Sequence, residues 1–161
     1  MKKVLIVKDE ILARLGLRQL VDWRKLELEL LPDATDGEEA LEMIRNSCPD
    51  IILLDLNIPK VSGLEILEFL KKEEMPTKVI VVSCQEEFDV VKKAMKLGAY
   101  DYLRKLNLSS DELENILEKC LVETEERITV HMQGIREIRY EEIVRDSRDI
   151  LAGACNYQTL I

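Results

Sequence analysis

The stretch PDIILLDLNIPKVSG, residues 49–63, decides the fold. Its four aliphatic residues, Ile51–Leu54, follow one another without alternation, which is typical of a strand covered on both faces in a parallel sheet. Asp55 comes directly after the run. Three turn residues come next: Asn57, Pro59 and Gly63. An acid at the carboxyl end of a buried parallel strand lies where open α/β sheets carry their sites. Asp55 is therefore either a site residue or a cap for the loop that follows it.

The same alternation of apolar segments continues through most of the chain. Four further strands are expected at residues 3–7, 28–34, 78–83 and 99–104, beside the strand at 50–55. Helices are expected at 11–21, from 36 to about 47, from 62, at 86–97 and from 109. Three of these helices start with the capping-box pattern of a Ser or Asp followed three residues later by Glu. The pairs are Asp36 with Glu39, Ser62 with Glu65 and Ser109 with Glu112.

Strands that alternate with helices predict a parallel sheet with helices on both faces. Among doubly wound orders, the flavodoxin-like order 2-1-3-4-5 suits five strands, and we take it over from known folds of this architecture. It places the first and third strands side by side. We therefore expect Asp9, after the first strand, to lie near Asp55.

Composition limits the classes of function. The chain has 161 residues, 47% of them hydrophobic and 34% charged, which fits one folded domain with a short addition. A net charge of -9 argues against a free-standing nucleic-acid binder. No apolar run approaches the roughly 20 residues that span a membrane. The first residues lack the pattern of a secretory signal, so we expect a cytoplasmic protein.

The four cysteines, at 48, 84, 120 and 155, show no close pairing. Zinc sites usually bring their ligands in close pairs, and the single histidine, His131, is near none of the cysteines in sequence. We interpret the cysteines as reduced thiols packed as small apolar groups.

Polar residues follow the expected strands at their carboxyl ends: Asp9, Glu10, Asp55, Ser83 and Lys105. Clustered carboxylates stay ionised only if a cation lies among them, and oxygen ligands suit Mg²⁺. A carboxylate beside Mg²⁺ can attack a phosphoryl group and become an acyl phosphate. An amine and a hydroxyl can then stabilise the phosphoryl oxygens. The set predicts phosphoryl transfer to an aspartate.

Over about residues 1–122 the chain resembles the receiver domains of two-component response regulators. The matching motifs are VLIVKDE, IILLDLNIPKVSG, VIVVS and AYDYLRK, in that order. The stretches RLGLRQLVDWRKLEL and EEFDVVKKAMKLGAYDYL look most like receivers fused to AraC-type DNA-binding domains.

The resemblance implies a role for each residue of the expected site. Asp55 is the phosphoacceptor, and Mg²⁺ is held by Asp9, Asp55 and the backbone carbonyl of Asn57, with Glu10 as an additional candidate. Ser83 is the switch hydroxyl, and Tyr102 is the aromatic that moves inward when this hydroxyl is recruited. Lys105 binds the phosphoryl group.

Two positions depart from the family pattern. Lys8 stands where the family usually has an acid, and at about 5 Å and an effective dielectric near 20 one charge pair is worth roughly 3 kcal/mol. Lys8 therefore makes the pocket a poorer Mg²⁺ site, and this effect is diluted if Lys8 pairs with Asp55 or Glu10 or turns into water. Leu106 stands where the family usually has proline after the lysine, and in the family the bond before this proline is typically cis. A cis bond before a residue other than proline costs about 3 kcal/mol. We expect a trans bond there and a shifted approach of Lys105.

The resemblance also implies how the protein works. A sensor histidine kinase would phosphorylate Asp55 in a phosphorelay, and an output domain outside this chain would control transcription. The chain would be a signalling phosphoacceptor and not a conventional enzyme, without contact of its own to nucleic acid or membrane. The alternative is a degenerate receiver that works as a phosphorylation-independent interaction or dimerisation module, because of Lys8 and Leu106. A dimer would use the fourth helix, fifth strand and fifth helix. Their charged residues are Lys92, Lys93, Lys96, Asp101 and Arg104.

Residues 123–161 are too few for a winged-helix or AraC-type domain. Ile128, Val130 and Met132 alternate as in a short strand, and a helix is expected over 134–151. This tail is either the start of a truncated linker or a self-contained extension.

Three other classes fit the sequence less well. A flavodoxin-like cofactor binder needs a glycine loop after the first strand, which is absent. The loops look too short to build the substrate pocket of a hydrolase. A histidine kinase would need a nucleotide-binding glycine motif, which this sequence lacks.

Overall fold

A five-stranded parallel sheet forms the centre of the molecule, in the predicted flavodoxin-like order β2-β1-β3-β4-β5. The structure is a computed structural model that describes residues 1–84, 87–105 and 108–135, with side chains described as far as residue 123. The strands are β1 (Lys2–Val7), β2 (Leu28–Leu30), β3 (Ile51–Leu54), β4 (Lys78–Ser83) and β5 (Asp101–Arg104).

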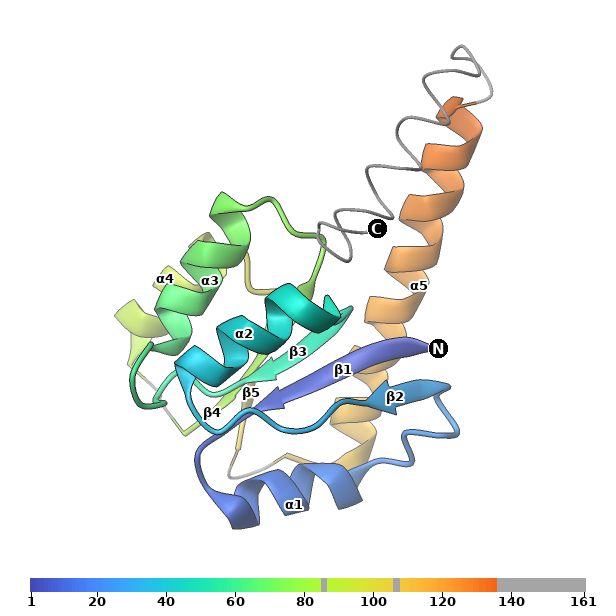
Figure 1. The fold of residues 1–161 in the computed structure, drawn as a ribbon. Coiled ribbons are helices and arrows are strands. Elements are labelled where there is room, and N and C mark those ends of the chain that lie inside the picture. The colour runs from blue at the N-terminus through green and yellow to red at the C-terminus, as the bar shows by residue number, and fades with distance from the viewer. Residues whose placement is uncertain (85–86, 106–107, 136–161) are drawn as a thin grey trace.

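Helices cover both faces of the sheet (Figure 1). They are α1 (Ile11–Leu20), α2 (Gly37–Ser47), α3 (Gly63–Lys72), α4 (Phe88–Lys96) and α5 (Ser110–Ile135). The first and last helices, α1 and α5, lie on one face, and α2, α3 and α4 lie on the other. No helix within the described residues is both long and apolar enough to cross a bilayer.

The unbroken apolar run of β3 supplies both hydrophobic cores. Ile52 and Leu54 pack among the buried residues under α2, α3 and α4, whereas Ile51 and Leu53 pack toward α1 and α5. Successive side chains of a strand point to opposite faces, so a strand between two helix layers needs apolar residues at every position. This explains why the run in the sequence shows no alternation.

The predicted helix starts are largely confirmed. Ser62 and Glu65 form a complete capping box at the start of α3, and the Ser109 hydroxyl accepts a hydrogen bond from the Glu112 N–H at 3.1 Å. The box at α2 is partial, because the Asp36 carboxylate caps Glu39 N–H whereas the Glu39 carboxylate accepts from the N–H of Thr35.

Strand β2 is shorter than predicted, ending at Leu30 and not at residue 34. Pro32 has no N–H to donate, so the ladder is interrupted. Single contacts resume beyond it: the N–H of Ala34 donates to the carbonyl of Ile6 at 2.9 Å, and Ala34 bridges to Val7.

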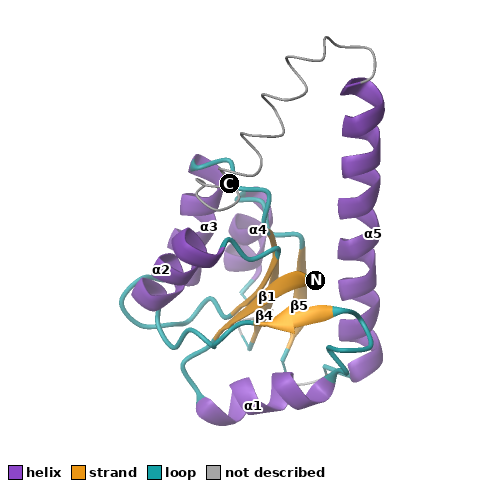
Figure 2. Cartoon of the chain, turned by 45° about the vertical axis from the view of Figure 1, so that its right-hand side comes forward, coloured by secondary structure: helices purple, strands orange, loops and turns teal. Residues whose placement is uncertain are grey.

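The strand expected at residues 128–132 is wrong. Helix α5 runs without a break through these residues to Ile135 (Figure 2), a length of about 39 Å at 1.5 Å per residue. The three alternating apolar residues were also compatible with a helix, and a continuous helix propagates more easily than an isolated strand forms. The helix expected over 134–151 lies outside the described residues from 136 on.

The cysteines of the described residues form no disulfide with one another. Cys120 is buried in the core beneath α5 as expected, and burial raises the pKa of its thiol to about 12. Cys84 is exposed, which corrects the expectation that it is packed, because it lies directly after the end of β4. Cys155 lies outside the described residues.

Candidate functional site

The carboxyl ends of the central strands bring the predicted acids to one edge of the sheet. Strands β1 and β3 are paired with Val7 opposite Leu54, and the N–H of Asp55 continues the ladder by donating to the carbonyl of Val7 at 3.0 Å. Asp9 follows β1 two residues beyond this pairing. Asp9 and Asp55 therefore share the same edge, as the strand order predicted.

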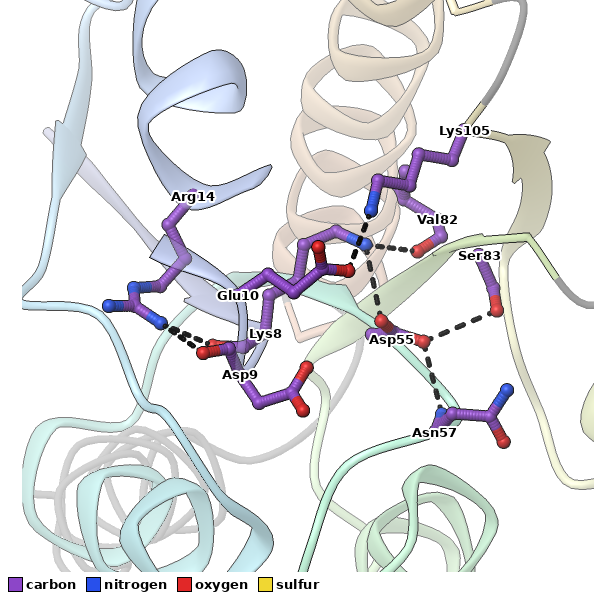
Figure 3. Close-up of polar contacts among 9 residues, drawn as sticks. All are labelled: Lys8, Asp9, Glu10, Arg14, Asp55, Asn57, Val82, Ser83 and Lys105. Atoms are coloured by element: carbon purple, nitrogen blue, oxygen red, sulfur yellow. Dashed lines mark hydrogen bonds and ion pairs between the residues drawn. The ribbon is translucent and has the colours of Figure 1, made fainter. Parts of the chain in front are cut away.

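Asp55 is held on both of its carboxylate oxygens (Figure 3). Oδ1 accepts hydrogen bonds from the backbone N–H of Asn57 at 3.0 Å and from the hydroxyl of Ser83 at 3.2 Å. Oδ2 lies 3.5 Å from the ammonium nitrogen of Lys8. The side chain keeps 14% of its surface exposed, so this carboxylate is oriented by its neighbours and still open to a reactant.

Lys8 is the feature of the pocket that the sequence did not decide. Its side chain is 1% exposed, and Nζ donates to the backbone carbonyl of Val82 at 2.8 Å as well as facing Asp55. Burial lowers the pKa of this ammonium, and the nearby Asp55 carboxylate opposes that shift. Of the three placements expected for Lys8, the structure thus has the pairing with Asp55.

Lys105 enters the same region from the end of β5 but pairs with a different acid. Its Nζ lies 3.2 Å from Oε1 of Glu10, and the Lys105 side chain is 29% exposed. Burial disfavours the charged form of Lys105, but the hydrogen bond and charge of Glu10 outweigh burial and raise its pKa. Two lysines therefore point into one pocket, each with its own carboxylate (Figure 3).

Arg14 fixes the loop between β1 and α1, a role that sequence reasoning missed. One guanidinium nitrogen donates to the backbone carbonyls of Lys8 at 2.9 Å and Asp9 at 3.0 Å. The same guanidinium pairs with Asp33 at 3.6 Å through its Nε. No residue pattern signals such a contact, because it depends on the path of the loop. The contact holds the backbone from which Lys8 and Asp9 project.

The loop after β3 is equally tightly fixed. Gly63 approaches the β3 end so closely that a Cβ there would lie 2.6 Å from Cα of Leu56 and 2.9 Å from the carbonyl oxygen of Asp55. Its N–H donates to the carbonyl of Leu56 at 3.1 Å. A side chain at this position would displace the backbone of Asp55, so the glycine positions the carboxylate.

The remaining predicted residues lie as follows. Tyr102 is half-buried on β5 and packs against the core beneath α2, α3 and α4. Leu106 lies outside the described residues, so the expected trans bond and shifted approach of Lys105 stay predictions. The side chain of Asp9 is exposed at the rim of the pocket.

The sheet order, the helices on both faces and the acids at the carboxyl edge define a receiver-type α/β domain. A family model of the response regulator receiver domain matches residues 4–118. The chain belongs to this family.

Relatives and solved structures agree with this assignment. The chain is 33% identical over 102 residues to the nitrate/nitrite response regulator protein NarL of Escherichia coli, covering 63% of this chain and 47% of NarL. It is 30% identical over 141 residues to the transcriptional regulatory protein YesN of Bacillus subtilis, covering 88% of this chain and 38% of YesN. The chain thus spans about half or less of the length of these curated relatives.

Among solved structures, the receiver domain of AraT, a response regulator from Geobacillus stearothermophilus, is 31% identical with a TM-score of 0.71. The alignment covers 78% of this chain and 97% of that domain. The finer likeness to receivers of AraC-type regulators stays a prediction.

Receiver domains generally bind Mg²⁺ in an acidic pocket. The donors of this pocket do not fit that ion as they are folded. The Lys8 ammonium takes the position beside Oδ2 of Asp55, and Glu10 is engaged by Lys105. Nowhere in the described ranges do three His, Cys, Asp or Glu side chains come close enough to hold a metal ion.

Proposed function

We propose that Asp55 is the phosphoacceptor of this receiver and takes its phosphoryl group from a partner sensor histidine kinase. The observation that carries the proposal is how the Asp55 carboxylate is oriented and exposed. Oδ1 is oriented by Asn57 N–H and the Ser83 hydroxyl, Oδ2 faces an ammonium, and the side chain remains partly exposed at the pocket mouth. Orientation favours attack of the carboxylate on phosphorus, and the neighbouring positive charge offsets the repulsion between the carboxylate and an anionic phosphoryl group.

The chain's own residues provide the parts of the transfer. A carboxylate oxygen of Asp55 forms the new bond to phosphorus, while the bond from phosphorus to the leaving group of the donor breaks and its electron pair departs with that group. The Ser83 hydroxyl donates to Asp55 now and can donate to the phosphoryl oxygens afterwards. Lys105 points into the pocket and supplies positive charge to the phosphoryl group.

The consequence of phosphorylation is a changed interaction surface. Ser83 ends β4 and Tyr102 lies on the neighbouring β5, with Val81 opposite Tyr102 in the register. We assign them the roles of switch hydroxyl and switch aromatic. The adjoining α4 already presents exposed apolar side chains, with Phe88 75% and Met95 44% exposed. This supports α4, β5 and α5 as the surface of a homodimer.

The names of two relatives support a transcriptional output for the signal. NarL and YesN are named as a response regulator and a transcriptional regulatory protein, and each is longer than the part this chain matches. We propose that a transcriptional output domain acts together with this receiver. We keep the division into a receiver at residues 1–122 and an extension at 123–161, joined by the continuous helix α5.

Intact-mass measurement with acetyl phosphate tests the proposal. The protein is expected to gain the mass of one phosphoryl group, and fragmentation is expected to place it on Asp55. Asp55→Asn removes the acceptor, and Asp111→Asn, at an exposed aspartate in the first turn of α5, serves as the matched control that keeps it. The absence of any modification at Asp55, with Mg²⁺ concentrations from none to high and with acetyl phosphate or a beryllofluoride mimic, contradicts the proposal.

A further inference from the structure

Lys8 is the most deeply buried charged side chain among the described residues. It leaves the end of β1, and its ammonium reaches the Val82 carbonyl of β4 and the carboxylate of Asp55 after β3. One side chain therefore joins the ends of three strands, with β3 between β1 and β4 in the sheet. A buried charge of this kind persists when it is paired and hydrogen-bonded, and here it is both.

The position of the ammonium is that of a cation serving the phosphoacceptor. It lies against Oδ2, the oxygen of Asp55 that accepts from neither Asn57 nor Ser83. The strong 2.8 Å hydrogen bond to Val82 anchors the ammonium from the opposite side. The Arg14 contact to the Lys8 carbonyl fixes the backbone from which the side chain extends.

The charge balance of the pocket supports the same reading. Lysine in place of an acid changes the local charge by as much as a divalent cation would contribute. A pocket with Lys8 and no metal therefore carries the same net charge as one with an acid at this position and Mg²⁺ bound. A metal added to the present pocket would have to overcome repulsion by this ammonium at close range.

We propose that the Lys8 ammonium is the resident cation of this receiver, standing in for a divalent metal beside Asp55. Metal binding at the pocket is consequently weak, and phosphoryl transfer to Asp55 does not depend on it. The second consequence rests on the proposed function, whereas the first does not.

The transfer step balances without a metal. An oxygen of Asp55 bonds to the phosphorus of acetyl phosphate, the bond from phosphorus to the acetyl oxygen breaks, and acetate leaves with the electron pair. No proton or electron is exchanged with another molecule. The negative charge on the transferred oxygens is met by the ammoniums of Lys8 and Lys105, both of which point into the pocket (Figure 3).

Mn²⁺ binding, followed by electron paramagnetic resonance, tests the first consequence. Lys8→Asp is expected to bind Mn²⁺ at least about tenfold more tightly than the natural protein does. In the natural protein the Lys8 ammonium repels the metal from the carboxylates of the pocket, and the variant removes this repulsion. Lys8→Met, which removes only the charge, should lie between the two. Equal affinity of the natural protein and Lys8→Asp overturns the proposal.

Lys119→Glu is the matched control. It makes the same change of net charge as Lys8→Asp, on the exposed side of α5. Lys119 lies one turn before Glu123, and Glu123 contacts Lys78 at the start of β4. The control position therefore lies toward the opposite edge of the sheet. Its Mn²⁺ affinity should equal that of the natural protein. Circular dichroism verifies that each variant is folded, and Lys8→Met decides the comparison if Lys8→Asp does not fold.

Phosphorylation by acetyl phosphate in EDTA tests the second consequence. The labelling rate of the natural protein should change by less than about twofold between EDTA and Mg²⁺. The labelling rate of Lys8→Asp should be about tenfold or more higher with Mg²⁺ than with EDTA. Labelling of the natural protein that EDTA abolishes overturns the proposal. If no variant is labelled under any condition, the phosphoacceptor function fails, and the Mn²⁺ comparison alone decides whether Lys8 is the resident cation.

Discussion

The interior of the sheet and its carboxyl edge differ sharply although they lie along the same strands. Leu53 and Leu54 are completely buried among apolar side chains. The next residue is Asp55, and beside it Lys8 is buried almost as completely as the leucines. The interior is stabilised by burial of apolar surface, which is non-directional. The edge is stabilised by one particular ion pair, which requires two specific side chains. The strands supply rigidity, and the edge uses it to hold charges in place.

The largest effect is expected from the interior. Leu53→Ala should lower the free energy of unfolding by about 3–4 kcal/mol, because it leaves a cavity among fully buried side chains. Urea denaturation measures the change. Leu12→Ala is the control, since Leu12 is 81% exposed and should cost less than about 0.5 kcal/mol. Similar losses in both variants would mean that the interior is not packed as described.

The next largest effect should come from the edge itself. Asp55→Asn is expected to cost about 3 kcal/mol of unfolding free energy, because it leaves the buried ammonium of Lys8 without its counter-charge. The same urea measurement decides. Asp9→Asn is the matched control, and its exposed side chain should make little difference. If Asp55 were only repelled by neighbouring acids, Asp55→Asn would stabilise the protein. A stabilising effect would therefore refute the ion pair.

The smallest effect is expected at the rim of the pocket. Glu10→Gln should change the free energy of unfolding by less than about 0.5 kcal/mol, because Glu10 is 66% exposed. It should lower the pKa of Lys105, since Glu10 contributes to raising it. The small stabilisation by this pair is present below the ordinary lysine pKa and is lost as pH rises through the raised one. NMR titration of the Lys105 side chain measures the shift, and an unchanged pKa contradicts the pairing.

The sequence was sufficient to predict the interior for a physical reason. The unbroken run of β3 and the helix starts at Ser62 and Ser109 are local patterns, and they determine layers and element types. Their few errors occur where a local pattern is ambiguous. Pro32 ends β2 early, and the alternation near Val130 fits a helix as well as a strand.

The edge could be predicted only in part. The strand order placed Asp9 and Asp55 together, but the placement of Lys8 remained open between Asp55, Glu10 and water, because a long side chain can reach several positions. The carbonyl of Val82, distant in sequence, settles its position, and no residue pattern announces a backbone acceptor. The guanidinium contacts of Arg14 were missed for the same reason.

A crystal structure determined at high Mg²⁺ concentration would show whether Lys8 or a metal ion neutralises Asp55. We expect Nζ of Lys8 still to donate to the carbonyl of Val82 and to face Oδ2 of Asp55, with no metal bound to that carboxylate. A magnesium ion coordinated by Asp55, with the Lys8 side chain turned out to solvent, would contradict it.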